Sequence, residues 1–306
     1  MRYRTLGRTG LEVSAIGLGG NRFAESQNTD EVRATFDMAL DRGVNLIDLA
    51  DCYGRGECER LVGRWIRRRR DAVILCSKVG ARPALSVRVD RWVDPIRRWF
   101  PSRPERHTAS NRPRPMENFS PNILRSGILG SLRRLRTDHL DVFYLHGPPP
   151  GVVADGAVFE ALEGEKRAGR ILHYGVSLSG SATTEEVLAC VDQPGLSIVQ
   201  VRVNTASTVD LERIETRARD AGVAMVAREV FLKGRLLDRY AAASDPVQGR
   251  APAQVLLQAV LQRQGVDAVL VGTTRRDHLE ENLAAVEATP LSEPEMAELW
   301  RSADVL

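Results

Sequence analysis

The stretch GVNLIDLADCYGRGE, residues 43–57, decides the class of fold that this chain adopts. Residues 45–49 form a short apolar run that is typical of a buried β-strand, yet the run contains Asp48 and is followed by Tyr53. A carboxylate is costly inside a strand unless a cation pairs with it. The stretch therefore predicts a strand that ends at a functional site, and it requires a cation from elsewhere in the chain.

The same alternation of a short apolar run and an amphipathic stretch recurs along the chain. Gly43, Gly169 and Gly222 each lie between an amphipathic stretch and an apolar run, as expected of left-handed helix caps. Eight strand–helix units in about 290 residues predict an α/β protein with a closed (β/α)8 TIM barrel. The predicted strands are residues 13–18, 45–49, 73–77, 140–145, 171–176, 198–203, 223–228 and 268–271. The predicted helices are residues 30–42, 57–69, 121–136, 156–168, 183–191, 210–221, 250–263 and 276–287, with another near 293–302.

A doubly wound sheet is the rival architecture, and it usually carries a glycine-rich turn that binds a dinucleotide. The sequence has no GxGxxG motif, which favours the barrel. The opening RTLGRTGLEV, residues 4–13, is typical of a short hairpin with a glycine turn, and such a hairpin could plug the barrel floor. We therefore expect one barrel domain over residues 1–306 with a hairpin at its N-terminus.

Residues 80–117 interrupt the barrel pattern as a long loop after the third predicted strand. They hold six prolines, nine arginines and four acidic residues, for a net charge of +5. Loops of this length are often lids, binding loops or flexible connections. A solvated loop, a lid that shapes a pocket for an anionic substrate, and an oligomer contact all fit this composition. The run RWIRRRR, residues 64–70, is interpreted as the solvated end of a helix, where cations complement the helix dipole.

The composition of the chain excludes several classes of protein. The 306 residues are 43% hydrophobic and 27% charged, as in ordinary globular proteins, and the net charge of +3 does not favour a nucleic-acid partner. No run of about 18 apolar residues predicts a membrane span, and no long apolar segment near the N-terminus predicts a secretory signal. We therefore expect a cytoplasmic protein. Its four cysteines lack CxxC or zinc-finger spacing, which predicts reduced thiols and no metal site.

Four chemically active residues lie at or just beyond predicted strand ends, which converge on one mouth of a barrel. They are Asp48, Tyr53, Lys78 and His146. A tyrosine phenol has an ordinary pKa of about 10, and a neighbouring cation lowers it. Asp48 would hold Lys78 charged beside Tyr53, while His146 would orient a carbonyl group or assist proton transfer. Tyr53 or His146 alone would fit ordinary core packing, but the four together favour catalysis.

Over nearly its whole length the chain resembles the aldo-keto reductase family. The resemblance rests on YRTLGRTGLEVSAIGLGG, GVNLIDLADCYG, ILCSKVG, NFSPNILRSGILGSLRRLRTDHLDVFYLH, GVS and GTTRRDHLEENLAAV. It implies a (β/α)8 barrel that binds NADP(H) across its mouth without a Rossmann motif and transfers hydride between nicotinamide and a carbonyl. It also implies that Asp48, Tyr53, Lys78 and His146 are catalytic, with Tyr53 as the general acid in reduction.

The resemblance also implies cofactor-binding residues at the mouth. Ser177 and Gln200 match partners of the nicotinamide carboxamide, and Arg275 matches the residue that holds the adenosine 2′-phosphate. Gly272, Thr273 and Thr274 would start the helix and offer backbone N–H groups to an anion, although a capping role without a ligand explains Thr273 and Thr274 almost as well. Two further residues, Glu281 and Asn282, match residues that hold adenine. The complete set is Gly20, Asn21, Ser177, Gln200, Arg228, Gly272, Thr273, Thr274, Arg275, Glu281 and Asn282.

Three departures from the family's usual pattern surround the expected nicotinamide site. Leu178 stands in place of an asparagine, Arg228 in place of a stacking aromatic ring, and Gly-Pro-Pro-Pro follows His146. The leading prediction is an NADPH-dependent reductase of a small aldehyde or ketone, sugar-like or anionic, without a nucleic-acid or membrane partner. One alternative is an epimerase or lyase that uses bound NADP for transient oxidation, and the other is a non-catalytic subunit that senses the cofactor.

Overall fold

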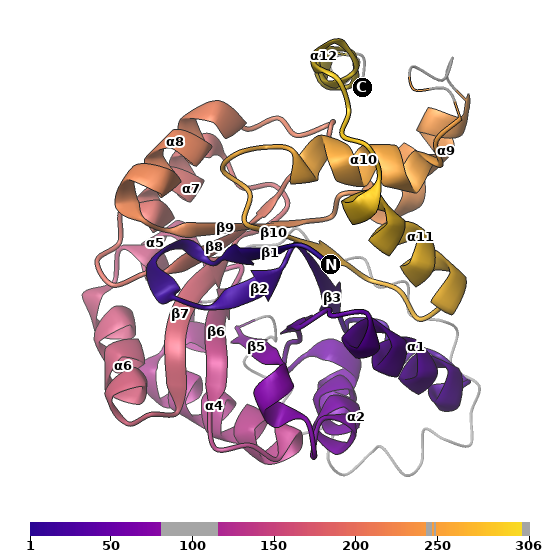
Figure 1. Cartoon of the computed structure of the whole chain (residues 1–306). Helices are drawn as coiled ribbons and strands as arrows, with labels where there is room; N and C mark the ends of the chain where they lie inside the picture. Colours follow the sequence, from indigo (N-terminus) through magenta and orange to yellow (C-terminus); the bar gives the residue numbers. More distant parts are fainter. Residues whose placement is uncertain (81–115, 243–246, 248, 302–306) are drawn as a thin grey trace, which may run out of the picture.

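The structure, a computed structural model, describes residues 1–80, 116–242, 247 and 249–301. Within these residues, eight parallel strands close into a barrel in the order β10-β3-β4-β5-β6-β7-β8-β9 (Figure 1). This arrangement confirms the predicted (β/α)8 barrel. The strands are β3 (Ile16–Gly19), β4 (Leu46–Asp48), β5 (Ile74–Val79), β6 (Leu140–His146), β7 (Ile171–Ser177), β8 (Ile198–Arg202), β9 (Ala224–Arg228) and β10 (Ala268–Val271).

Helices surround the barrel and cover its outer face (Figure 1). Nine of the described helices match predicted ones, and they are α1 (Thr29–Asp41), α2 (Glu57–Trp65), α4 (Pro121–Leu135), α6 (Gly156–Arg167), α7 (Thr184–Val191), α8 (Leu211–Ala221), α10 (Pro252–Leu261), α11 (Arg276–Glu287) and α12 (Glu293–Arg301). The sequence did not predict α5 (Pro150–Val153) or α9 (Arg235–Ala242), which lie in the loops after β6 and β9. Gly43, Gly169 and Gly222 have φ angles of 85°, 72° and 66°, which confirms the predicted left-handed caps.

Side chains along each barrel strand point alternately inward and outward, because successive residues of a strand face opposite sides. Leu46 and Val142 belong to the apolar cluster that fills the barrel, whereas their neighbours Ile47 and Phe143 belong to the cluster between the barrel and the helices. Every second residue after an inward-facing one also faces inward, so the last inward-facing residue of each strand lines the carboxyl-terminal mouth.

The N-terminal hairpin closes the opposite end of the barrel. Its strands β1 (Tyr3–Thr5) and β2 (Glu12–Ser14) pair antiparallel around the short 3₁₀ helix η1 (Gly7–Thr9). Leu6 and Val13 are fully buried members of the interior cluster, which confirms that the hairpin plugs the floor. The prediction of one strand over residues 13–18 is wrong. The run divides near Ala15 because β2 pairs with β1, whereas β3 pairs with β4 and β10.

The arginine run at residues 64–70 differs from its interpretation as a solvated helix end. Helix α2 ends at Trp65, so the predicted helix over residues 57–69 is too long. Arg69 forms ion pairs with Asp37 and with another acidic residue of α1. Arg70 is 17% exposed, and its Nη2 lies 2.8 Å from Asp141 Oδ2 on β6. Arg69 and Arg70 therefore connect this segment to α1 and β6 through ion pairs.

Two expectations from the sequence concern the surroundings of the barrel. The interpretations of residues 80–117 fall on a segment that lies almost wholly outside the described residues. None of the helices that the structure describes is long and apolar enough to cross a membrane.

Candidate active site

Three adjacent strands bring the predicted catalytic side chains to one part of the mouth. Asp48 ends β4, Lys78 is the penultimate residue of β5, and His146 ends β6. These strands are consecutive in the barrel. The alternation that sends Leu46 and Val142 inward also sends Asp48 and His146 inward, two and four positions further on. Tyr53 begins the 3₁₀ helix η2 (Tyr53–Gly56), in the loop that follows β4.

Lys78 and Asp48 form the buried ion pair that the sequence predicted. Their side chains are 1% and 6% exposed, and Lys78 Nζ lies 2.5 Å from Asp48 Oδ2. Lys78 Nζ also donates a 2.9 Å hydrogen bond to the carbonyl oxygen of Leu49. Burial alone would lower the pKa of the Lys78 ammonium, but attraction to Asp48 and proximity to Tyr53 outweigh it and raise this pKa. Lys78 is therefore held as a cation.

Tyr53 lies against both Lys78 and His146. Lys78 Nζ is 5.3 Å from the centre of the Tyr53 ring, and the rings of Tyr53 and His146 meet edge to face at 6.0 Å. The sequence predicted that the neighbouring cation would lower the pKa of the phenol. Lys78 acts in that direction, but burial acts more strongly, and the pKa of Tyr53 is raised above its ordinary value. The resting phenol therefore keeps its proton.

Cys52 lies next to His146 and was not predicted as part of the site. Its Sγ is 3.8 Å from His146 Nδ1. This contact fixes one edge of the imidazole ring beside Tyr53. The position could have been suspected from the sequence, because Cys52 immediately precedes Tyr53.

Gln200 on β8 contacts the Lys78–Asp48 ion pair and is also one of the residues expected to bind the nicotinamide. Its Nε2 donates a 2.7 Å hydrogen bond to Asp48 Oδ1. Its Oε1 is buried and has no hydrogen-bond partner in the described part of the chain. Ser177, at the end of β7, pairs in register with Gln200 and is 2% exposed. The two predicted carboxamide partners thus lie side by side, with an acceptor oxygen that lacks a donor.

The segment after β10 differs in detail from its prediction. Helix α11 begins at Arg276, so Thr273 and Thr274 precede the helix and do not start it. The Thr273 side chain is buried, and its Oγ1 accepts a 3.1 Å hydrogen bond from the N–H of Arg275. The carbonyl oxygen of Thr274 accepts a 3.2 Å hydrogen bond from Thr35 Oγ1 of α1. Both threonines therefore hold the loop in place.

Arg275 is the exposed cation of this segment. Its side chain is 59% exposed and forms an ion pair with Asp277 in the first turn of α11. This arginine lowers the pKa of the Asp277 carboxyl through a direct hydrogen bond. Further along α11, Glu281 is half-buried and Asn282 is 5% exposed. The predicted 2′-phosphate and adenine residues thus occupy one helix and the loop before it.

Gly20 and Asn21, after β3, lie beside the start of this loop. A side chain at Gly272 would approach Asn21 Oδ1 to 3.1 Å. A side chain at Gly20 would approach the Phe23 ring to 2.9 Å and would overlap other apolar groups, so packing alone requires glycine there. The structure places Gly20 and Asn21 close to Gly272. Packing around Gly20 explains the glycine at this position without a bound cofactor.

Arg228 ends β9, and its side chain is held by contacts that the sequence did not predict. It forms an ion pair with Glu229, and its Nη2 donates to the carbonyl oxygen of Leu178. Glu229 also forms an ion pair with Arg202 of β8, with Arg202 Nε 3.2 Å from Glu229 Oε2. The alternation of β8 could have indicated Arg202, since it follows Gln200 by two positions. No pattern in the sequence indicated the role of Glu229.

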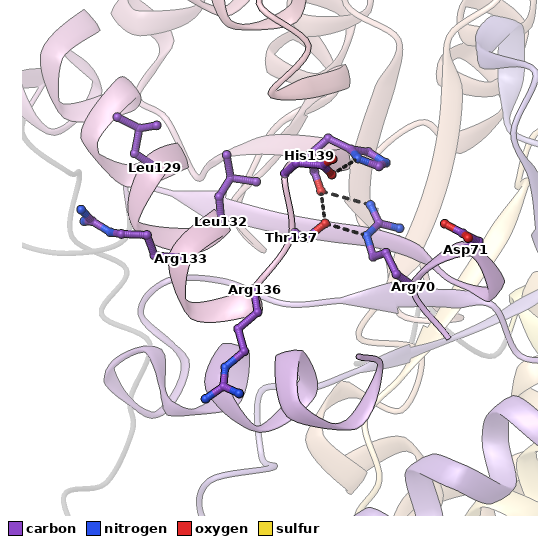
Figure 2. A pocket seen from close by; sticks show the side chains of 9 residues that line it. Arg70, Asp71, Leu129, Leu132, Arg133, Arg136, Thr137 and His139 are labelled. Carbon is purple, nitrogen blue, oxygen red and sulfur yellow. Dashed lines mark hydrogen bonds and ion pairs between the residues drawn. The ribbon is translucent and has the colours of Figure 1, made fainter. Parts of the chain in front are cut away.

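A separate cavity has a volume of about 760 Å³, and Figure 2 shows the side chains that line it. Its lining includes Arg70, just before β5, and Thr137 and His139, just before β6, so it lies at the amino-terminal end of the barrel. None of the predicted catalytic residues lines it. The candidate active site is therefore the mouth, where the predicted catalytic residues lie. Among the described side chains, no group of three or more His, Cys, Asp or Glu residues is arranged to hold a metal ion.

Polar side chains gathered at the carboxyl-terminal mouth of a closed parallel barrel define an enzyme of the (β/α)8 class. Comparison with known proteins narrows this class. The model of the Aldo/keto reductase family matches residues 15–304. The chain belongs to this family.

Similar proteins span almost the whole chain. An uncharacterized oxidoreductase of Bacillus subtilis, YqkF, is 26% identical over 98% of this chain and 95% of its own length. The holo form of aldo-keto reductase AKR11C1 from Bacillus halodurans superposes with a TM-score of 0.77 at 25% identity, covering 98% of this chain and 96% of that one. An aldo/keto reductase from Klebsiella pneumoniae, solved in complex with NADP and acetate, gives a TM-score of 0.75 at 25% identity, covering 99% and 96%.

Proposed function

We propose that this protein is an NADPH-dependent reductase that converts an aldehyde or ketone to an alcohol, with Tyr53 as the general acid. The observation that carries the proposal is the position of Lys78. Its ammonium is paired with buried Asp48 at 2.5 Å and lies 5.3 Å from the centre of the Tyr53 ring. A cation held beside a buried phenol stabilises the phenolate that forms when the proton leaves.

The cofactor is proposed from the mouth's own residues and from its relatives. The buried Oε1 of Gln200 lacks a donor among the described residues, and a carboxamide NH₂ would supply one. Ser177 would bind the same group from the neighbouring strand. When bound, the reduced nicotinamide supplies the hydride. The Klebsiella pneumoniae relative was solved with NADP, which supports the same cofactor here.

The four catalytic residues divide the proton-transfer task. Tyr53 holds its proton at rest, because burial raises the pKa of its phenol. The Lys78 ammonium has three N–H donors. Two of them donate to Asp48 and to the Leu49 carbonyl oxygen, which leaves the third for the Tyr53 phenol oxygen. Lys78 thereby favours the departure of the proton to a substrate oxygen. His146, whose Nδ1 faces Cys52, orients the same substrate oxygen from beside the Tyr53 ring.

The preference for NADPH over NADH is proposed to depend on Arg275. Its guanidinium is exposed and is paired with Asp277, which is also exposed. Solvent-exposed ion pairs contribute little, so a 2′-phosphate can replace Asp277 at small cost. NADH lacks this phosphate and should bind more weakly.

Replacing Tyr53 with phenylalanine tests the proposal. We expect Tyr53→Phe to reduce carbonyl turnover by about 10²–10⁴-fold, the contribution of a positioned general acid, and to leave NADPH affinity nearly unchanged. Fluorescence titration would measure affinity, and NADPH consumption would measure turnover. Tyr3→Phe is the matched control, because the Tyr3 hydroxyl donates to Gly43 at the opposite end of the barrel.

Two results would contradict the proposal. Full turnover by Tyr53→Phe would exclude the phenol as the acid. Product formed without stoichiometric consumption of NADPH would indicate an epimerase or lyase in which the cofactor is recycled.

A further inference from the structure

Two arginines point into the barrel mouth from neighbouring strands. Arg202 of β8 and Arg228 of β9 are register partners, and both follow inward-facing residues, Ile198 and Val226, by an even number of positions. Both side chains are therefore directed to the inside of the mouth, one layer beyond Gln200. Two like charges in adjacent positions repel each other unless an anion lies between them.

Glu229 supplies this anion from within the chain. Its carboxylate pairs with Arg228 through one oxygen and with Arg202 Nε at 3.2 Å through the other. Its backbone has a φ of 57°, a left-handed conformation that is costly for a residue with a side chain. Asn204 Nδ2 donates a 2.9 Å hydrogen bond to the Glu229 carbonyl oxygen and supports this conformation. The chain thus holds a carboxylate where the two guanidinium groups meet.

The positive charge of the cluster is only partly balanced. One carboxylate serves two guanidinium groups, and the side chains of Arg202 and Glu229 are 36% and 26% exposed. The Nε of Arg228 is buried and has no hydrogen-bond partner among the described residues. Gly180, in the loop after β7, leaves room for the Arg202 guanidinium, since any side chain there would overlap it. The Arg202 guanidinium is thus partly exposed, and it lies beside an Arg228 guanidinium that has an unused buried donor.

We propose that Arg202 and Arg228 form an anion-binding subsite at the mouth, in which Glu229 occupies the place of a ligand's phosphate or carboxylate group. The inference rests on the proposed function for its location beside the nicotinamide site. An incoming oxyanion displaces the Glu229 carboxylate from Arg202 and accepts hydrogen bonds from the guanidinium N–H groups in its place. The anion comes either from the diphosphate of the cofactor or from an acidic group of the substrate.

Calorimetric titration with inorganic diphosphate tests the subsite without cofactor or turnover. The background variant is Arg275→Ala, which removes the other candidate phosphate site. In it, we expect Arg202→Gln to weaken diphosphate binding about tenfold or more, as loss of a charge-assisted contact should. We expect Glu229→Gln to strengthen binding, because it removes the competing carboxylate. Opposite effects from the two partners of one ion pair distinguish a ligand site from a structural contact.

The Glu185–Arg213 pair provides the matched control. It links α7 to α8, with 2.6 Å between Arg213 Nη1 and Glu185 Oε1, and both side chains are exposed. Glu185→Gln and Arg213→Gln should leave diphosphate binding unchanged. Equal weakening by Arg202→Gln and Glu229→Gln, or no change from either, would overturn the subsite. Thermal melting of each variant would show whether it is folded.

Two further measurements identify the source of the anion. If the cofactor supplies it, Arg202→Gln weakens NADPH and NADH equally, because both carry the diphosphate. If the substrate supplies it, both cofactors bind as before, and the KM rises for 4-carboxybenzaldehyde but not for uncharged benzaldehyde. A wild-type protein that binds diphosphate through Arg202 but neither binds NADPH nor reduces an aldehyde would refute the proposed function and leave the subsite standing.

Discussion

Lys78 and Asp48 are buried together, and the cost of burying either charge depends on the other. Removing one partner of a buried ion pair leaves an uncompensated charge and typically costs about 3–5 kcal/mol of stability. Lys78→Met should therefore lower the free energy of unfolding by roughly this amount, because among the described side chains Asp48 would retain only Gln200 as a hydrogen-bond partner. Urea denaturation followed by circular dichroism would measure it.

The double variant Lys78→Met/Asp48→Asn separates stability from catalysis. It removes both charges, so it should recover most of the lost stability. Turnover should stay far below that of wild type in both variants, because neither has an ammonium beside Tyr53. A double variant as unstable as the single one would show that packing at Lys78, rather than its charge, holds this part of the mouth together.

The residues at the mouth were predictable to different degrees. Asp48, Lys78 and His146 were predictable because a polar residue at the end of an apolar run has few structural explanations. The bond from Gln200 to Asp48 was not, because it joins strands that are not neighbours in the barrel. The contact of Arg202 with Glu229 was not predictable either, since it depends on the register of β8 against β9 and on a left-handed backbone.

At the scale of the element, the residue just before β10 is a carboxylate, Asp267, whose burial disfavours its charged form. Asp267 Oδ2 accepts a 2.8 Å hydrogen bond from the N–H of Met225 on β9. Burial raises the pKa of Asp267 from its ordinary 3.8 to about 6, despite that hydrogen bond and the attraction of Arg4. Between these values the folded protein keeps a proton that the unfolded chain has lost, so folding becomes less favourable as pH rises.

Asp267→Asn should remove this pH dependence. The asparagine oxygen can still accept from Met225, but it does not ionise. The difference between about 6 and 3.8 corresponds to roughly 3 kcal/mol. We therefore expect wild type to lose up to about 3 kcal/mol relative to Asp267→Asn between about pH 4 and 6. Urea unfolding of both proteins across this range would measure it, and parallel curves would contradict it.

The order and type of the elements were predictable because each unit repeats one pattern, but several boundaries were not. Residues 13–18 form a continuous apolar run, and only strand pairing divides it between the hairpin and the barrel. Helix α2 stops at Trp65 although arginines favour a helix, because Arg69 and Arg70 are held by acidic residues of other elements. The bounds of α11 match the predicted helix over residues 276–287, and Thr273 and Thr274 are engaged in the loop before it.

At the scale of the whole molecule, stability and chemistry occupy opposite ends of the barrel. Leu6 of the hairpin plug is fully buried against the interior cluster, while the proposed catalytic residues lie at the mouth. Leu6→Ala should cost about 2–5 kcal/mol of unfolding free energy, as expected for a large core truncation. NADPH affinity at temperatures where the variant is folded should match wild type.

Leu172→Ala is the control for this truncation, because Leu172 is 37% exposed. Its effect on unfolding should stay within about 0.5 kcal/mol, the range of ordinary surface substitutions. A large loss of NADPH affinity in Leu6→Ala, without unfolding, would mean that the plug and the mouth are coupled through the barrel interior.

The closure of the barrel between β10 and β3 also constrains how the protein is made. Ile16 pairs with Val269, which lies 253 residues later in the chain. A ribosome adds about 5–20 residues per second, so roughly 13 to 50 s separate the synthesis of these two residues. During that interval the open edge of β3 has no strand from β10 to cover it, and unpaired edges recruit other chains. A nascent chain of this protein should therefore need a holding chaperone until its last strand leaves the exit tunnel.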